Sequence, residues 1–275
     1  MPMARERVDN ALVTLGLCES LDMARALIMA GRVYQAEIKV NKASDLVKQG
    51  LPLIVRDAKL PFVSRGGLKL QKAMQLFDVD VQNHVCIDVG SSTGGFTDCM
   101  LQAGARRVYA VDVGYGQLDY KLRNDPRVQV MERTNARFIQ PEQFDPSPSF
   151  GATDVSFISL KAILPSTLQV LRGENRRFVA LIKPQFEALP HQVGAKGVVR
   201  DPAVHFETTK AIADFVPSIS WTAHRIAVSP IKGPEGNIEF LLDLFPCEAG
   251  VSQLTDVQIS DVVQAAYDNF VKSAE

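Results

Sequence analysis

The sequence predicts an α/β protein in which a small α+β domain precedes a large Rossmann-like domain with a mostly parallel sheet. From Arg65 onward, apolar runs of strand length alternate with segments of helical periodicity, the pattern of successive βαβ units. Before residue 60 the chain carries two short amphipathic segments and a few apolar triplets, too little to enclose a cofactor. We therefore expect domains at residues 1–60 and 65–275, joined by a linker at 61–64.

The small domain is expected to contain two short helices within residues 5–33. Each has a stripe of apolar residues at helical spacing, and the second stripe ends at Gly31. The stripes are Val8, Leu12, Leu15 and Leu17 in the first helix, and Met23, Leu27 and Ile28 in the second. Short strands are expected at Val33, Ile38–Val40 and Leu53–Val55.

The large domain is expected to hold six strands, each a short apolar run. They are Val85–Val89, Val108–Asp112, Val128–Met131, Gly151–Val155, Phe178–Ile182 and Phe240–Leu244. Helices are expected after the first of these strands through Leu101, near 161–172 and 204–216, and at Val257–Val271. Strands that are apolar along their whole length are typical of a parallel sheet covered by helices on both faces.

The composition narrows the class of protein and its compartment. A chain of 275 residues, 46% of them hydrophobic, can bury a substantial core, and a net charge of −1 gives no bulk attraction to nucleic acid. The four cysteines have no metal-ligand spacing; they are Cys18, Cys86, Cys99 and Cys247. No apolar stretch follows the charged N-terminus, and no run reaches the ~18 apolar residues of a membrane span. We expect a cytoplasmic protein with reduced thiols, no metal and no membrane contact.

The strongest local motif is a Gly-rich turn directly after the first strand of the large domain. Its residues let the chain turn tightly and let a ligand approach the backbone. The next strand ends in Asp112, where an acidic residue typically accepts hydrogen bonds from the ribose of an adenosine cofactor. Asn135, after the third strand, is a further candidate contact. The cofactor-binding candidates are Asp88, Gly90, Ser91, Ser92, Thr93, Gly94, Gly95, Phe96, Asp112 and Asn135.

Two cofactors compete for such a turn. A dinucleotide would require glycines in a G-x-G-x-x-G arrangement, which the spacing from Gly90 to Gly94-Gly95 does not match. An acidic Asp88 would repel a pyrophosphate, whereas it suits the ammonium group of S-adenosylmethionine. The residues therefore favour the methyl donor, although a Gly-rich turn also occurs where a loop merely packs.

Several motifs, in order along the chain, resemble the TlyA branch of the FtsJ-type ribose methyltransferases. They are Asp88-x-Gly90-x-x-x-Gly94-Gly95, Phe62–Gly67, Asp154–Phe157, Lys183–Glu187 and Gly236–Phe240. The resemblance extends from Arg7 to about Leu244. It implies S-adenosyl-L-methionine as cofactor and 2′-O-methylation of ribosomal RNA within ribosomal subunits, at cytidine. It also implies that the small domain is an RNA-binding domain of the ribosomal-protein-S-four type.

The same resemblance identifies candidate RNA contacts and some departures from the family pattern. The candidates are Arg7, Arg25 and Arg32 in the small domain and Arg65 and Arg137 in the large one. The departures are Leu21 where a basic residue is usual, Gln35–Glu37 in place of Val-Asn-Gly, and Thr93 where such loops often have proline. The first two departures bear on the strength of RNA contact rather than on the fold.

FtsJ-type enzymes carry a Lys-Asp-Lys-Glu tetrad, and the matching residues here are Lys69, Asp154, Lys183 and Glu239. A ribose hydroxyl is a weak acid, so a group must orient it and take its proton during attack on a methyl group. The resemblance assigns this role to Lys183, with Lys69 as a second cation and the two carboxylates holding the lysines. Taken singly, Lys69 could be a surface lysine and Asp154 a helix cap, whereas Glu239 lies among apolar residues and needs a partner.

Three other functions remain as alternatives. The first is an RNA-binding ribosome-assembly factor without turnover, which the intact tetrad and cofactor loop disfavour. The second is a membrane-lytic haemolysin, the label that many members of the family carry. The acidic residues of the expected C-terminal helix disfavour it, because a lytic helix is usually basic. The third is methylation of a base, which Asp154–Phe157 disfavours because it lacks the prolines of an amino-methylating turn.

Overall fold

The computed structural model describes residues 5–18, 20–29, 31–35, 38–48, 53–55, 61–233, 235–247 and 254–270. The chain divides into two compact units, Met1–Leu60 and Pro61–Glu275. Ala36 and Glu37 of the departing triplet, and Val271 at the end of the expected last helix, lie outside the described residues.

The first unit contains two helices and short strands around a small apolar core. The helices are α1 (Val8–Thr14) and α2 (Leu21–Met29). Strands β2 (Val33–Gln35), β3 (Ile38–Lys39) and β5 (Leu53–Val55) form one sheet in the order β3-β2-β5, and β1 (Arg5–Arg7) pairs with β4 (Leu46–Lys48). Because β1 and β4 have only three residues each, no alternation of polar and apolar residues predicted them.

The predicted apolar stripes of this unit are only partly correct. Val8, Leu12 and Ile28 are buried as expected. Leu15 follows the end of α1 and is 60% exposed, and Met23 is 43% exposed, on the outer side of α2. Leu17 is exposed as well. The periodicity failed because α1 ends after seven residues, so its spacing does not continue to positions 15 and 17.

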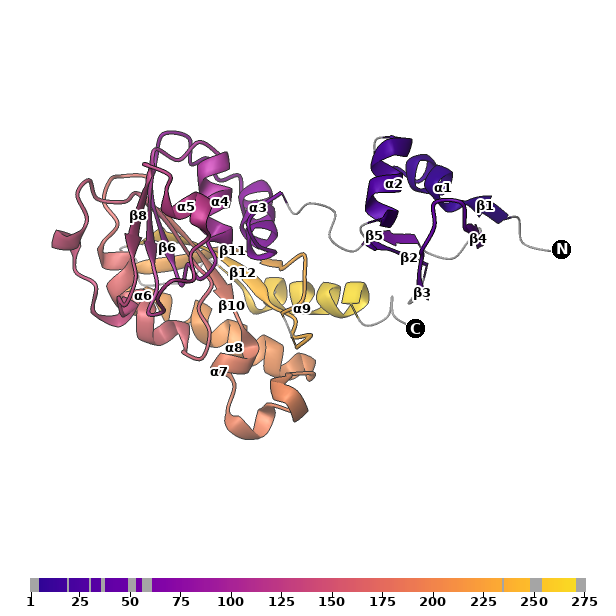
Figure 1. The fold of residues 1–275 in the computed structure, drawn as a ribbon. Helices are drawn as coiled ribbons and strands as arrows, with labels where there is room; N and C mark the ends of the chain where they lie inside the picture. Colours follow the sequence, from indigo (N-terminus) through magenta and orange to yellow (C-terminus); the bar gives the residue numbers. More distant parts are fainter. Residues whose placement is uncertain are drawn as a thin grey trace. The chain divides into compact units, whose positions relative to one another are not determined.

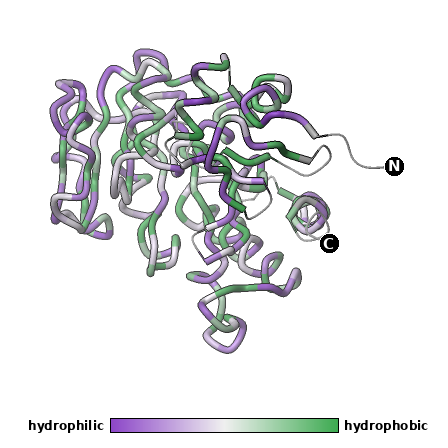
Figure 2. The backbone as a smooth tube through the Cα atoms, turned by 45° about the vertical axis from the view of Figure 1, so that its right-hand side comes forward, coloured by the Kyte–Doolittle hydropathy of each residue, from purple (hydrophilic) through white to green (hydrophobic). Residues whose placement is uncertain are grey.

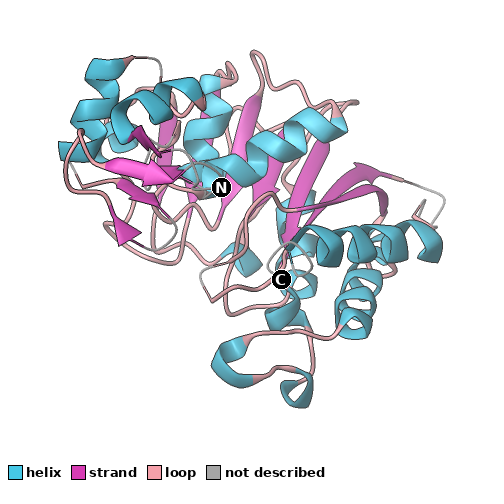
Figure 3. Cartoon of the chain, turned by 90° about the vertical axis from the view of Figure 1, so that its right-hand side faces the viewer, coloured by secondary structure: helices cyan, strands magenta, loops and turns pink. Residues whose placement is uncertain are grey.

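The second unit is built on a seven-stranded sheet in the order β11-β12-β10-β9-β6-β7-β8. Its strands are β6 (Val85–Val89), β7 (Arg107–Val111), β8 (Val128–Met131), β9 (Phe150–Thr153), β10 (Arg177–Ile182), β11 (Trp221–Val228) and β12 (Phe240–Pro246). The five strands from β8 to β10 pair in parallel, whereas β12 is antiparallel to both β10 and β11. The predicted mostly parallel sheet is confirmed. Figure 3 shows these strands side by side with helices on either side.

Helices cover both faces of this sheet (Figure 1). Helices α3 (Gly66–Phe77), α4 (Gly95–Gln102) and α5 (Tyr120–Arg123) contribute to the apolar core of one face. Helices α6 (Leu160–Gln169), α8 (Pro202–Ala213) and α9 (Asp256–Phe270) contribute to that of the other. Single-turn pieces lie in the connections: α7 (Pro184–Glu187), η1 (Ala136–Phe138), η2 (Pro141–Gln143), η3 (Pro190–Gln192), η4 (Ala195–Gly197) and η5 (Val216–Ile219). The hydropathy colouring in Figure 2 shows green stretches running through the interior.

Six of the seven strands match the sequence expectation, two of them to the residue, and β11 was missed. Its sequence places His224 and Arg225 in the middle of an apolar run. The pairing with β12 shifts register between Ala223 and Arg225, so a bulge breaks the alternation from which a strand is recognised.

The expected linker at 61–64 belongs to the second unit. Phe62 is buried in the core beside α3 and α4, and the Val63 amide donates to Asp98 Oδ2 at 2.9 Å. The Gln102 amide nitrogen also donates to the Pro61 carbonyl at 2.8 Å. The change in sequence pattern near residue 60 predicted a linker here, but these contacts with α4 exist only in the folded unit.

One buried carboxylate ties three elements of this unit together. Asp243, on β12, is 0% exposed and accepts from Arg177 on β10 at 2.7 and 2.8 Å. Arg225 on β11 donates to the same carboxylate at 3.1 Å. Both guanidinium groups also donate to the Phe77 carbonyl at the end of α3. A charge buried this deeply is tolerated because two cations share it.

We predict that Asp243→Ala lowers the free energy of unfolding by about 3 kcal/mol, because two partly buried guanidinium groups lose their common partner. Urea denaturation followed by circular dichroism measures this difference. The matched change Asp261→Ala removes an exposed carboxylate on α9 and should cost less than about 0.5 kcal/mol. If both variants lose equally little free energy of unfolding, water replaces Asp243 as the partner of the two arginines, and the buried ion pairs do not stabilise the sheet.

Candidate active site

Polar side chains gather at one edge of the large sheet, where the parallel strands end. Asp112 follows β7, Asp154 follows β9 and Lys183 follows β10. Since β12 runs antiparallel, its first residues lie at this same edge: Ile182 pairs with Phe240, which places Glu239 beside Lys183 along the rim. Ligands of open α/β sheets bind at this carboxyl edge.

The four tetrad residues predicted from the sequence form one cluster. The Lys69 Nζ, from α3, lies 3.3 Å from Asp154 Oδ2 and 2.7 Å from Glu239 Oε2. The Lys183 Nζ lies 2.6 Å from Asp154 Oδ1. Asp154 therefore bridges the two lysines, one on each carboxylate oxygen. Lys183 also donates to the Ser156 hydroxyl at 2.8 Å, a partner that the sequence analysis did not assign.

Burial and mutual charge set the protonation behaviour of this cluster. Burial by itself lowers the pKa of Lys69, but the carboxylates of Asp154 and Glu239 outweigh it, so that pKa is raised. Burial acts to raise the pKa of Asp154, yet the two lysines outweigh it and hold that pKa below its ordinary value. Burial raises the pKa of Glu239, and the pairing with Lys69 offsets this only in part. The raised pKa favours the charged form of Lys69, so this residue is better suited to act as a cation than as a base.

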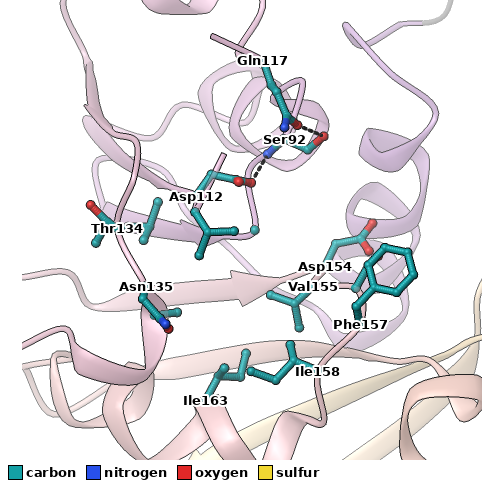
Figure 4. A pocket seen from close by; sticks show the side chains of 15 residues that line it. Ser92, Asp112, Gln117, Thr134, Asn135, Asp154, Val155, Phe157, Ile158 and Ile163 are labelled. Carbon is teal, nitrogen blue, oxygen red and sulfur yellow. Dashed lines mark hydrogen bonds between the residues drawn. The ribbon is translucent and has the colours of Figure 1, made fainter. Parts of the chain in front are cut away.

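A cavity of about 360 Å³ opens beside the cluster (Figure 4). One side is polar, with Ser92, Asp112 and Gln117, and Asp154 lies across from them. Its remaining lining is largely apolar, apart from Thr134, Asn135 and Ser156, and contributes Gly90, Val111, Val113, Ala136, Val155, Phe157, Ile158 and Ile163. The cavity therefore has a polar edge, an apolar wall and a direct opening onto the tetrad through Asp154.

Asp112 organises the polar edge of the cavity. Its two carboxylate oxygens accept from the Ser92 amide at 2.8 Å and from the Gly114 amide at 2.7 Å. The Ser92 hydroxyl donates to Gln117 at 3.3 Å. These contacts, drawn in part in Figure 4, hold the Gly-rich turn and the loop after β7 at a fixed spacing.

Gly90 shows why this turn requires glycine. Its φ is +82°, and a Cβ there would lie 2.9 Å from Val155 Cγ1 and 3.0 Å from the Asp154 carbonyl oxygen. The backbone of the turn thus passes directly against the segment that carries Asp154. Any side chain would push the cavity wall and the tetrad apart.

Only some of the predicted cofactor residues line the cavity: Gly90, Ser92, Asp112 and Asn135 do. Asp88, expected opposite a cofactor ammonium, is instead fully buried beneath the turn, where its Oδ2 accepts from the Thr97 amide at 2.8 Å and hydroxyl at 2.7 Å. Its role in this fold is to hold the start of α4. The other predicted residues do not line the cavity. Ser91 and Gly94 are buried in the turn, Gly95 and Phe96 are buried at the start of α4, and Thr93 is exposed in the turn.

The arginines expected to contact RNA have different surroundings. Arg7 and Arg25 are half-exposed and lie 2.7 and 3.7 Å from the buried carboxylate of Asp9, so both are partly occupied within the first unit. Arg65, at the start of α3, is exposed and donates to the Lys232 carbonyl at 3.4 Å. Arg137 is exposed above the Phe138 ring. Arg32 comes after α2, is half-buried and is not without an interaction partner.

The cavity residues that the sequence analysis did not single out come mainly from two places. Val155, Ser156 and Phe157 belong to a motif that was noted for its resemblance, and its position after a strand could have marked them as lining residues. Gln117 and Thr134 lie in loops without a recognisable pattern, so only the folded chain brings them to the site.

Among the described residues, no group of three or more His, Cys, Asp or Glu side chains is arranged to hold a metal ion. Within the same residues, no helix combines the length and the apolar character that crossing a bilayer requires.

Comparison with protein families agrees with this architecture. Residues 62–244 match the model of the FtsJ-like methyltransferases, and residues 6–52 match the S4 domain. These matches define a methyltransferase of the FtsJ-like class with an N-terminal S4 domain. Within that class the chain belongs to the TlyA family.

Relatives cover nearly the whole chain. YqxC of Bacillus subtilis, named as a candidate rRNA methyltransferase, is 48% identical over 97% of this chain and 96% of its own length. A Mycobacterium tuberculosis protein named 16S/23S rRNA (cytidine-2′-O)-methyltransferase TlyA is 42% identical over 86% of this chain and 89% of its own. A solved Streptococcus thermophilus structure, titled as a hemolysin candidate, superposes with a TM-score of 0.77 at 41% identity and covers 99% of both chains.

The burial of Asp88 leads to a prediction about stability and pH. Burial raises the pKa of Asp88 to about 7 from an ordinary 3.8, although Thr97 works against it. The folded state then binds this proton more tightly than the unfolded state. The stabilisation is complete below the unfolded pKa and is lost as the pH rises toward 7.

We therefore expect the free energy of unfolding of the natural protein, relative to Asp88→Asn, to fall between pH 4 and 7 by up to about 1.4 kcal/mol per pH unit. Urea denaturation at several pH values measures the difference. The exposed carboxylate removed in Asp261→Asn serves as control and should give a flat difference. A flat difference for Asp88→Asn as well would contradict the raised pKa.

Proposed function

We propose that this protein transfers a methyl group from S-adenosyl-L-methionine to the 2′-hydroxyl of a cytidine in ribosomal RNA. The observation that carries the proposal is the Lys69–Asp154–Lys183–Glu239 cluster beside a cavity whose polar edge holds Asp112. Two relatives with 42% and 33% identity are named for methylation at this position of cytidine. A ribosomal substrate would place the activity in the cytoplasm.

The chemistry of the cavity lining supports the methyl donor as its ligand. Asp112 would accept hydrogen bonds from its ribose, since a carboxylate has lone pairs beyond those that Ser92 and Gly114 occupy. The apolar wall with Ile158 and Ile163 suits an adenine ring. When bound, the cofactor supplies a methyl group made electrophilic by a positive sulfur. Asp88 is too deeply buried to contact it directly.

The chain's own residues would prepare the attacking hydroxyl. An ammonium group has three N–H donors, and Lys183 directs two of them at Asp154 and Ser156. The remaining position would orient the ribose oxygen and, when the amine is neutral, accept its proton. Lys69 stays charged between its two carboxylates and would stabilise negative charge that develops on that oxygen.

The two alternatives from the sequence predict different behaviour. An assembly factor without turnover would bind the cofactor and RNA but transfer nothing. A membrane-lytic protein is suggested by a 42% identical Brachyspira hyodysenteriae relative named Hemolysin A. Neither alternative needs two lysines buried around one aspartate, which is the feature that favours an enzyme.

The decisive test concerns Lys183. We expect Lys183→Ala to lower kcat for labelled methyl transfer to bacterial ribosomal subunits by about 10²–10⁴-fold, because orientation and proton acceptance are lost together. We expect Lys183→Arg to be about as inactive, since a guanidinium keeps the charge but does not accept a proton. The label should appear in alkali-resistant dinucleotides, the signature of a blocked 2′-hydroxyl.

Lys210→Ala is the matched control, because this lysine pairs with Asp214 and Asp256 and does not line the cavity. Substantial activity in Lys183→Arg would assign the residue an orienting role alone. No transfer by the natural protein to subunits or free RNA, despite cofactor binding, would favour the assembly factor. Leakage from liposomes would favour the lytic alternative.

A second prediction concerns the cofactor. Asp112→Ala should weaken S-adenosylmethionine binding by at least about tenfold, because it removes the ribose acceptor and frees the two loops that Asp112 joins. Asp112→Asn should weaken binding less, since the oxygen of its side-chain amide still accepts one backbone hydrogen bond. Isothermal titration calorimetry measures both. Unchanged affinity in Asp112→Ala would place the cofactor elsewhere.

A further inference from the structure

The turn that follows Asp154 carries much of the site. Asp154 joins the two lysines, Ser156 accepts from Lys183, and Phe157 lines the cavity. Phe157 has a φ of +63° and is 90% exposed. A bulky side chain rarely adopts this backbone conformation, so contacts from outside the turn have to stabilise it.

The single turn of helix α7 contacts this segment at both of its ends. At its start, Lys183 reaches Asp154 at 2.6 Å and Ser156 at 2.8 Å. At its last residue, Glu187 accepts from the Ser159 hydroxyl at 2.6 Å and from the Leu160 amide at 2.7 Å. Two polar links, four residues apart on α7, therefore fix both ends of the turn.

Glu187 is well suited to hold the far end of the turn. Its two carboxylate oxygens bind two different donors, which fixes the direction of the side chain. One donor is a backbone amide in the first turn of α6, where a negative charge is favourable. The other is Ser159, which accepts from the Lys161 amide and caps the same helix.

An aromatic contact lies between the two polar links. The ring centroids of Phe157 and Phe186 are 5.0 Å apart at an interplanar angle of 49°. Since Phe186 precedes Glu187, displacement of α7 would move the partner of the exposed Phe157 ring as well. The turn and α7 thus behave as one unit with three points of contact.

We propose that Glu187 is a positioning residue: it fixes the turn from Val155 to Ser159 so that Ser156 meets Lys183 in the geometry needed for methyl transfer. This inference rests on the proposed function. Glu187 lies outside the tetrad and does not line the cavity, so it acts through the turn rather than on the substrate.

The test compares Glu187→Ala with Glu187→Gln. The alanine variant removes both acceptors, and we expect kcat for methyl transfer to fall at least about tenfold while the S-adenosylmethionine Kd stays within about twofold. The glutamine variant accepts from the Leu160 amide and donates to Ser159, so activity should recover to within about threefold of the natural protein. Glu142→Ala, at an exposed glutamate on η2, is the matched control and should change neither quantity.

A double-mutant cycle separates positioning from general loss of structure. If Glu187 acts through Ser156, then Glu187→Ala combined with Ser156→Ala should reduce kcat about as much as the stronger single change does. Should Glu187→Ala not fold, Glu187→Asp provides the same comparison, because the shorter side chain cannot reach both donors.

The outcomes are distinguishable from failure of the proposed function. No transfer by the natural protein would overturn that function. Transfer by the natural protein with an unchanged kcat in Glu187→Ala would overturn only the positioning role. If the kcat losses of Glu187→Ala and Ser156→Ala multiply in the double variant, Glu187 does not act through Ser156 and has a purely structural role. The same conclusion follows if cofactor affinity falls as much as kcat does.

Discussion

Asp154 lies between two buried ammonium groups, and the arrangement of the site depends on this bridge. Each carboxylate oxygen binds one lysine, so removal of Asp154 would leave Lys69 and Lys183 as neighbouring cations with too few partners. Glu239 pairs with Lys69 at 2.7 Å, so the cluster holds two carboxyl groups for its two lysines. Such a cluster is stable only when all four side chains lie close together, so the elements that carry them must meet at one edge of the sheet.

The order and direction of the strands bring the four residues to the same edge. Asp112, Asp154 and Lys183 each directly follow a parallel strand, and Glu239 directly precedes β12, which brings it to the same rim because β12 runs in the opposite direction. Helix α3, which precedes the first strand of the sheet, supplies Lys69. A wholly parallel sheet would have placed the start of β12 at the far edge. The reversed strand is therefore what completes the charge balance.

The cavity and the charged cluster lie next to each other at this edge of the sheet. Gly90 brings the cofactor turn against the backbone of Asp154, so the cavity and the cluster share one wall. That wall is the turn with Ser156 and the strained Phe157, held from behind by α7. A small displacement of the turn would change both the cavity and the hydrogen bonding of Lys183, which is why its support by Glu187 matters for function.

The sequence by itself determined the α/β class and most strands of the large sheet, because apolar runs are local properties of the chain. Its short motifs predicted four residues that the folded chain brings together. It did not determine the buried role of Asp88, the bulged strand β11 or the exposure of Leu15 and Met23. Nor did it indicate that Asp243 joins two arginines or that Glu187 accepts hydrogen bonds from Ser159 and from the first amide of α6. These features depend on which distant segments become neighbours, and only strand order and helix packing decide that.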